Sequence, residues 1–177
     1  MDIWSVGHGA RPLGELIATL RGADIEVLAD VRSQPGSRRH PQFGGQALAT
    51  ALGEVGIAYE HLPELGGRRG ALADSPHRAL RVAAFRGYAD HMSTAEFTRG
   101  YERLTTLARR SRTAFMCAET VWWRCHRRLI ADRLTADGWA VTHLFAPGKS
   151  EPHVLWDTAR IDNGNLVYDA GTLPIPS

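Results

Sequence analysis

Apolar and polar residues alternate in blocks along the chain, and the blocks predict strands and helices in turn. Short apolar runs predict strands at residues 2–6, 25–31, 57–62, 113–117, 139–145 and 165–170. Longer segments with apolar residues three and four positions apart predict helices within residues 11–25, 45–55, 84–111 and 122–137. The alternation predicts a single α/β domain over residues 1–177, with three layers and a largely parallel central sheet of about five to six strands flanked by helices.

The least ordinary stretches of the chain follow the first four predicted strands. They are GHGAR (7–11), DVRSQPGSRRHP (30–41), PELGGRRG (63–70) and CAETVWWRCHRR (117–128). Ligands of a parallel sheet bind beyond the carboxyl ends of its strands, where such loops meet. We therefore expect one functional site at that edge of the sheet.

Composition adds a cationic character without a strong net charge. The chain has a formal charge of +2, and its 21 basic residues are 20 arginines and Lys149. A GC-rich genome would account for this bias, but the planar guanidinium also grips phosphate in two places. No apolar run approaches the roughly 18 residues of a membrane span, and no secretory signal is evident. We expect a cytoplasmic protein with no membrane partner and no obligate protein partner.

The two cysteines, Cys117 and Cys125, allow several interpretations. They can be small buried side chains, and Cys117 is also a candidate nucleophile near a helix N-terminus. A zinc site with His126 is disfavoured because adjacent residues of a helix point about 100° apart. The segment also lacks the close Cys-x2-Cys pair of structural zinc sites. The sequence thus predicts no metal and no cofactor.

The chain shares features with two families that have catalytic cysteines. Six residues separate Cys117 from Arg124, one more than in the phosphatase loop, and Glu119 would oppose an anion there. LADVRS (28–33) is similar to a segment of rhodanese-like domains, which carry a catalytic cysteine after a later strand. The adjacent tryptophans fill the space of the persulfide loop, so sulfur transfer by Cys117 stays the alternative.

Two carboxylates and two histidines are candidates for acid–base chemistry. Asp30 and Glu119 follow apolar strands, where a carboxylate can activate water or stabilise a cationic intermediate. His8 and His126 lie nearby in the predicted arrangement and could protonate a leaving group. The alternative is structural, with Asp30 paired to an arginine and Glu119 capping the next helix.

Aromatic and basic side chains could bind the substrate itself. Tyr88, Trp122 and Trp123 can stack on a base or simply pack in the core. The arginines near the expected site can hold phosphates. These arginines are Arg32, Arg38, Arg39, Arg68, Arg69, Arg86 and Arg127.

Several segments together resemble a known family. SVGHGARPLGELIATL, LADVRSQPGSRRHPQF, YEHLPELGG, FRGYADHM and MCAET…CHRRLIADRL resemble, in order from about residue 3 to 145, the domain of unknown function 488 of bacteria and archaea. ETVWWRC departs from the family, where acidic or polar residues are more usual than two tryptophans. The resemblance implies a compact α/β domain and a cluster of matched residues. These are His8, Asp30, Arg32, Arg38, Arg39, Glu64, Arg86, Tyr88, Cys117, Glu119, Cys125, His126 and Arg127.

The resemblance also implies removal of modified bases from DNA. Together with the residues above, it favours an enzyme on nucleic acid, specifically a monofunctional DNA glycosylase of the hydrolase class that acts on an extruded base in DNA repair. No lysine lies in the cluster, so a Schiff-base mechanism is not expected. The alternatives are a rhodanese-like sulfurtransferase, a nucleotide hydrolase and a non-catalytic nucleic-acid-binding module.

Overall fold

A six-stranded sheet forms the centre of the computed structural model, which describes residues 1–36 and 38–170. Its strands are β1 (Asp2–Gly7), β2 (Val27–Asp30), β3 (Ala58–His61), β4 (Thr113–Cys117), β5 (Ala140–Ala146) and β6 (Lys149–Pro152). The order is β3-β2-β4-β1-β5-β6, and only β6 runs antiparallel to its neighbour. The predicted α/β class with a largely parallel sheet is confirmed.

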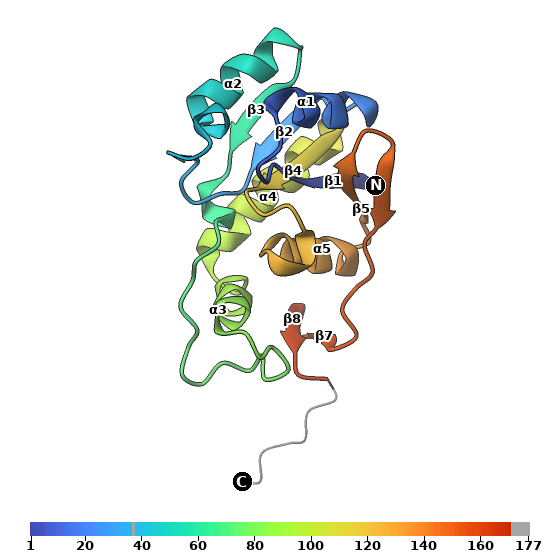
Figure 1. The fold of residues 1–177 in the computed structure, drawn as a ribbon. Helices are drawn as coiled ribbons and strands as arrows, with labels where there is room; N and C mark the ends of the chain where they lie inside the picture. Colours follow the sequence, from blue (N-terminus) through green and yellow to red (C-terminus); the bar gives the residue numbers. More distant parts are fainter. Residues whose placement is uncertain (37, 171–177) are drawn as a thin grey trace, which may run out of the picture.

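Helices cover both faces of the sheet and complete three layers (Figure 1). One face carries α1 (Leu13–Gly22) and α2 (Gly45–Glu54). The other carries α3 (Ala83–His91), α4 (Ala95–Arg110) and α5 (Arg127–Ala136). Short 3-10 helices η1 (Pro41–Phe43), η2 (Pro63–Leu65) and η3 (Trp122–Arg124) lie in the loops. None of the described helices combines the length and apolar character needed to cross a bilayer.

The central strands divide the apolar residues between two cores. Neighbouring residues of a strand point to opposite faces, so Leu28 packs with α1 and α2 while Ala29 packs on the α5 side. Phe115 and Met116 divide in the same way on β4. This double burial explains why residues 25–31 are almost entirely apolar, as expected for a central strand.

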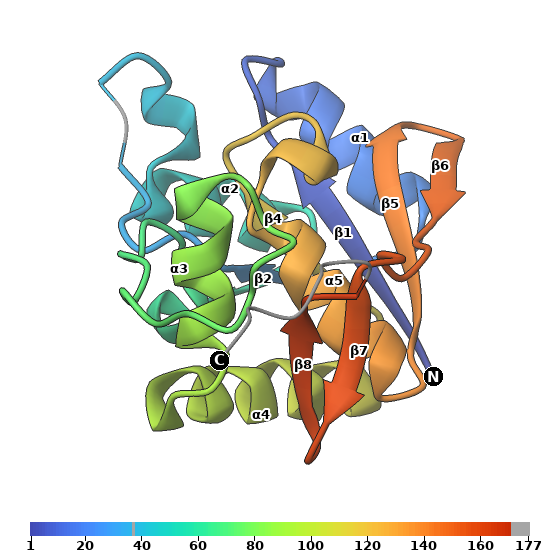
Figure 2. The same cartoon turned by 90° about the horizontal axis from the view of Figure 1, so that it is seen from below.

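The end of the described chain forms a second, smaller sheet. β7 (Ala159–Asp162) and β8 (Asn165–Tyr168) pair as an antiparallel ribbon, joined by a turn in which Asn163 and Gly164 have positive φ. The ribbon lies outside α5, on the side away from the central sheet (Figure 2). β8 was predicted, whereas β6 and β7 were missed because their side chains are mostly polar and exposed.

The helix predicted at residues 122–137 begins five residues later than expected. Residues Trp122–Arg124 form the 3-10 turn, and Cys125 is extended, with φ −128° and ψ 152°. α5 starts at Arg127. Cys125 therefore lies outside the helix, and the expectation that helical geometry separates its side chain from that of His126 is wrong.

Candidate functional site

Hydrogen bonds join the loops at the carboxyl edge of the sheet. The backbone amides of His8 and Gly9 donate to the carbonyls of Cys117 and Ala118, linking the segments after β1 and β4. The Ser33 hydroxyl donates to the Gly67 carbonyl at 3.0 Å, which links the segments after β2 and β3. All four loops therefore lie at one edge, as the sequence predicts.

Asp30 is fully buried at this edge and is engaged by Arg32. Its two oxygens accept from Arg32 Nε at 2.8 and 3.1 Å and from Nη2 at 2.5 Å. The Tyr59 hydroxyl donates to Oδ2 at 2.7 Å. A carboxylate held in this way orients its neighbours and is poorly placed to take a proton from substrate. Arg32, itself only 7% exposed, is likewise not free to bind phosphate.

His8 continues the Asp30–Arg32 cluster on the same face of the sheet. Its Nδ1–H donates to the Gly9 carbonyl at 2.8 Å, and its Nε2 accepts from Arg32 Nη1 at 3.1 Å. The ring stacks on Phe43 with centroids 4.2 Å apart. Desolvation by burial lowers the pKa of His8 to about 4. His8 is therefore neutral near pH 7 and its single proton is committed to the backbone.

Cys117, Cys125 and His126 form a second cluster, on the α5 side of the sheet. His126 Nδ1 lies 3.8 Å from Cys117 Sγ and 3.6 Å from Cys125 Sγ. On the other side of the ring, Nε2 lies 3.1 Å from the Val31 carbonyl oxygen. The hydrogen bond between the sulfurs raises the pKa of Cys117 and lowers that of Cys125.

Tyr88 and Arg127, both expected to touch substrate, are in the interior. Tyr88 is 1% exposed, donates to the Leu65 carbonyl at 2.7 Å, and packs on the His126 ring with centroids 5.0 Å apart. Arg127 is also 1% exposed and donates to Ser5 Oγ at 3.1 Å and to the Glu119 carbonyl at 2.5 Å. Base stacking and phosphate binding both require exposure, so these two roles are corrected to structural ones.

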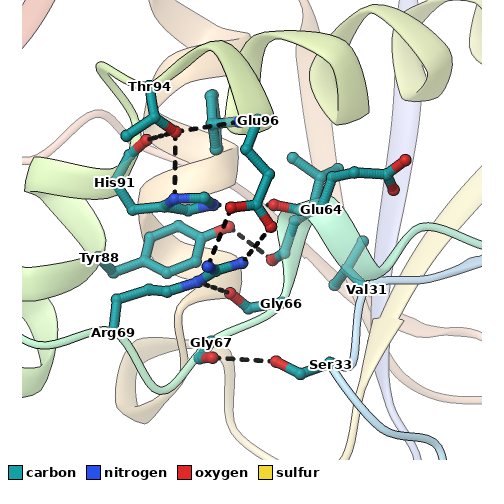
Figure 3. Close-up of polar contacts among 12 residues, drawn as sticks. Val31, Ser33, Glu64, Gly66, Gly67, Arg69, Tyr88, His91, Thr94 and Glu96 are labelled. Atoms are coloured by element: carbon teal, nitrogen blue, oxygen red, sulfur yellow. Dashed lines mark hydrogen bonds and ion pairs between the residues drawn. The ribbon is translucent and has the colours of Figure 1, made fainter.

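The loop after β3 is held by its own set of contacts (Figure 3). Arg69 forms two hydrogen bonds with the Glu96 carboxylate, at 3.1 and 2.9 Å, and donates from Nε to the Gly66 carbonyl. Arg86 donates to the Leu80 carbonyl at 2.9 Å. Both arginines stabilise loops, which makes them weaker candidates for phosphate contacts. Glu64, from the resemblance cluster, pairs with Arg103 at 2.9 Å.

The two tryptophans differ in exposure. Trp122 stacks on His143 with centroids 4.2 Å apart and an interplanar angle of 6°, and its Nε1–H donates to Glu151 at 2.5 Å. Trp123 meets Trp122 edge-on and is 43% exposed. Of the three aromatic residues expected at the site, Trp123 offers the most open surface.

A carboxylate and several arginines at the edge remain exposed. Glu119 is exposed after β4, and only its backbone carbonyl takes part in the contacts described above. Arg38, Arg39, Arg68 and Arg124 are exposed on the loops after β2, β3 and β4. Within residues 1–36 and 38–170, none of these four guanidinium groups forms an ion pair. Arg38, Arg39 and Arg68 are the predicted phosphate ligands that the fold leaves accessible, and Arg124, which was not predicted as one, is exposed at the same edge.

Sequence reasoning missed a buried polar chain beside Arg127. Asp132 Oδ1 accepts from His153 Nε2, His153 Nδ1 accepts from His143 Nε2, and Ser5 Oγ donates to His143 Nδ1, at 2.9, 2.9 and 3.0 Å. Burial lowers the pKa of His143 to about 2, so its ring is neutral. Because the Asp132 carboxylate can only accept hydrogen bonds, it sets which atom carries the proton at each step of this series of hydrogen bonds. Polar residues at inward positions of the apolar strands, such as Ser5 and His143, were the available signal.

Comparison with known proteins gives one match. The family model described as "Domain of unknown function DUF488" matches residues 12–134, which is more than half of the chain. No curated protein and no solved structure gives a significant match. The matched range includes the Asp30 cluster, except His8, and the whole Cys117–His126 segment.

Proposed function

We propose that this chain, which belongs to the family of domain of unknown function DUF488, acts on DNA and hydrolyses the glycosidic bond of a modified base. One observation carries the proposal. The exposed Glu119 carboxylate shares the carboxyl edge of a parallel sheet with exposed arginines that form no ion pair among the described residues. This combination joins an anion-binding surface to a group that can act on a cationic transition state.

The arginines support a polymeric, phosphate-rich substrate. Arg38 and Arg39 follow β2, Arg68 follows β3, and Arg124 follows β4. These strands are neighbours in the order β3-β2-β4, so the side chains come from adjacent loops. Charges spread over three loops suit a backbone with several phosphates better than a single small anion.

Trp123 supports action at the base. Enzymes that act on a base in a duplex extrude it and hold it against aromatic side chains. Trp123 lies between Glu119 and Arg124 in the chain and is 43% exposed. An extruded base stacked on this ring would be held near the loop that contains Glu119.

Glu119 is the group best placed to perform the chemistry. Breaking a glycosidic bond develops positive charge on the sugar, which a carboxylate stabilises while it orients or deprotonates the attacking water. Asp30 and His8 support the site indirectly, because both are buried and bonded to Arg32. The departing base takes its proton from solvent in this scheme, since neither His8 nor His126 has a free N–H directed at the exposed edge.

The test measures base release. Oligonucleotides carrying a panel of modified bases are incubated with the protein and then cleaved with alkali at abasic sites. Glu119→Gln removes the charge but keeps the size, and it should slow release by about a hundredfold or more. Glu54→Gln, exposed at the end of α2 beside the opposite edge, is the matched control and should leave the rate unchanged.

Three other outcomes would contradict the proposal in distinct ways. Release of base only from free nucleotides would indicate a nucleotide hydrolase. Binding of DNA without product for any base would indicate a binding module. Sulfur transfer from thiosulfate to cyanide, with no base release, would indicate thiol chemistry at Cys117. The contact between Cys117 and the His126 ring favours that last alternative, but Cys117 is only 8% exposed, which limits its access to a sulfur donor.

A further inference from the structure

We propose that Cys117, Cys125 and His126 form a binding site for a zinc ion, with three protein ligands and a fourth position open to water or substrate. The two sulfurs and a ring nitrogen of His126 all lie within 4.8 Å of one another. Among the described residues these are the only three that group in this way. The proposal does not depend on the function proposed above, because its tests measure the metal itself.

The spacing of the three atoms fits tetrahedral zinc. Zinc binds sulfur at about 2.3 Å and imidazole nitrogen at about 2.0–2.1 Å, so tetrahedral angles place these two ligand types about 3.6 Å apart. The distances from His126 Nδ1 to the sulfurs of Cys117 and Cys125 are 3.8 and 3.6 Å. Both nitrogen-to-sulfur distances therefore match those of ligands that share one zinc ion.

The His126 ring is oriented as a metal ligand would be. The Val31 carbonyl oxygen can only accept a hydrogen bond, so Nε2 carries a proton and donates to it at 3.1 Å. In the neutral ring this leaves the lone pair on Nδ1, which is the atom that faces both sulfurs. Metal-ligating histidines commonly use their second nitrogen to donate to a carbonyl in this manner.

Packing around the ring keeps Nδ1 directed at the sulfurs. Tyr88 lies against His126 on one side, with centroids 5.0 Å apart, and Tyr88 is fixed by its hydrogen bond to Leu65. Gly67 approaches so closely that a Cβ there would lie 2.8 Å from Nδ1. Figure 3 shows how this loop is held in place by Ser33 and by the Arg69–Glu96 pair.

The chemistry of the ligands selects the ion. Thiolate and imidazole ligands favour zinc and other soft or borderline metals over magnesium and calcium. Two thiolates balance the charge of a divalent ion, so the buried group formed by the ion, Cys117 and Cys125 would carry no net charge. A set of two cysteines and one histidine leaves one of the four zinc positions for an exchangeable ligand.

The topology of the fold also favours a metal at this position. Cys117 ends β4, whereas Cys125 and His126 lie just before α5. A metal would therefore tie the end of a central strand to the start of the helix that covers it. The eight-residue separation that looked unsuitable for zinc is the length of the loop that returns from the strand to the helix.

Metal content provides the first test. Protein without a histidine tag, purified under reducing conditions and dialysed against metal-free buffer, should contain about one zinc per chain by mass spectrometry, because the described part of the chain has one set of three ligands. Replacement by Co²⁺ should give intense thiolate-to-cobalt charge-transfer bands and the visible bands of a tetrahedral ion. Wild-type protein that holds no zinc and gives no such cobalt spectrum overturns the proposal. Both readouts use the unmodified chain, so they do not depend on a variant that folds.

Variants assign the ligands. Cys117→Ser, Cys125→Ser and His126→Gln should each lose bound zinc. In any cysteine variant that still binds Co²⁺, the charge-transfer band should fall to about half, because one of two thiolates is gone. His40→Gln, on the loop after β2, is the control and should bind normally. Retention of zinc by all three variants, or a reversible disulfide between the two cysteines in place of metal, would overturn the assignment.

Discussion

Asp30 and Glu119 show what decides the role of a single residue in this fold. Both carboxylates follow apolar strands, and their sequence contexts made them equal candidates for the catalytic carboxylate. The side chain of Asp30 turns to the face packed by α1 and α2, where Arg32 and Tyr59 occupy its oxygens. Glu119 lies beyond the end of β4 and is exposed. Pairing of Asp30 with an arginine was one of the two alternatives that the sequence offered, and the neighbouring Arg32 fulfils it. The contact with Tyr59 and the exposure of Glu119 depend on the folded arrangement of distant segments, which the sequence alone could not provide.

The depressed pKa of His8 predicts a pH dependence of stability. The unfolded chain binds a proton at His8 near pH 6.5, whereas the folded chain does so only near pH 4. Between these values the unfolded state holds more protons, so the free energy of unfolding should fall as the pH is lowered. The contribution of one such group is about 1.4 kcal/mol per pH unit at most.

His8→Gln isolates that contribution. Other buried histidines, including His143, titrate in the same direction, so wild-type protein alone cannot assign the slope. Urea unfolding at several pH values from 4 to 6.5 should give a shallower pH dependence for the variant, by close to one proton. Equal slopes in the two proteins would show that His8 accepts a proton as readily in the folded as in the unfolded state.

At the scale of an element, residues 118–126 explain the main error in the predicted secondary structure. Their composition is compatible with a helix that begins at Trp122, and nothing local opposes it. Tertiary contacts decide otherwise, because Trp122 is held by Glu151 and by the His143 ring. Arg127 also binds the Glu119 carbonyl, which requires the loop to fold back over the end of β1. Because α5 starts late, the His126 ring nitrogen Nδ1 can face the sulfurs of both Cys125 and Cys117.

Contact between β1 and this loop predicts a strong effect of Gly7→Ala. A Cβ at Gly7 would lie 1.9 Å from the Glu119 carbonyl oxygen and 2.7 Å from Arg127 Nη2. The loop must move and the Arg127 hydrogen bond must break, so we expect a loss of about 2–4 kcal/mol in the free energy of unfolding. Urea denaturation measures this change as a lower midpoint with a similar slope.

Gly53→Ala is the matched control within α2. A Cβ there meets no atom within 4 Å, and alanine restricts the unfolded chain more than glycine does. We expect this variant to gain about 0.5–1 kcal/mol. If Gly7→Ala were tolerated as well as Gly53→Ala, the close packing of the loop on β1 would be incorrect.

At the scale of the whole molecule, the sequence predicted the central strands and the loops at their carboxyl edge far better than the periphery. The interior strands β1, β2 and β4 are largely buried on both faces and must be apolar, so they stand out clearly in the sequence. The position of the loops after the parallel strands then follows from topology. β6 and β7 are exposed and polar, and their formation depends on pairing with β5 and β8. The loops at this edge could be placed in advance, but the sequence predicted one shared site, whereas the Asp30 cluster and the two cysteines lie on opposite faces of the sheet.

Under the proposed function, the distribution of arginines over the carboxyl edge predicts how binding of DNA should respond to salt. Each phosphate neutralised by an arginine releases counterions, so the logarithm of the binding constant falls with the logarithm of salt by about 0.9 per contact. Arg38→Ala and Arg39→Ala should each weaken binding and flatten that slope by about one. Arg110→Ala removes another exposed arginine, from the end of α4, next to the start of β4 and thus at the opposite edge. Fluorescence anisotropy with a labelled duplex over a series of salt concentrations measures all three variants. Arg110→Ala alters the net charge by the same amount as the other two substitutions. Equal salt slopes for the three variants would therefore show that the overall charge of the protein attracts DNA and that the carboxyl edge does not bind it.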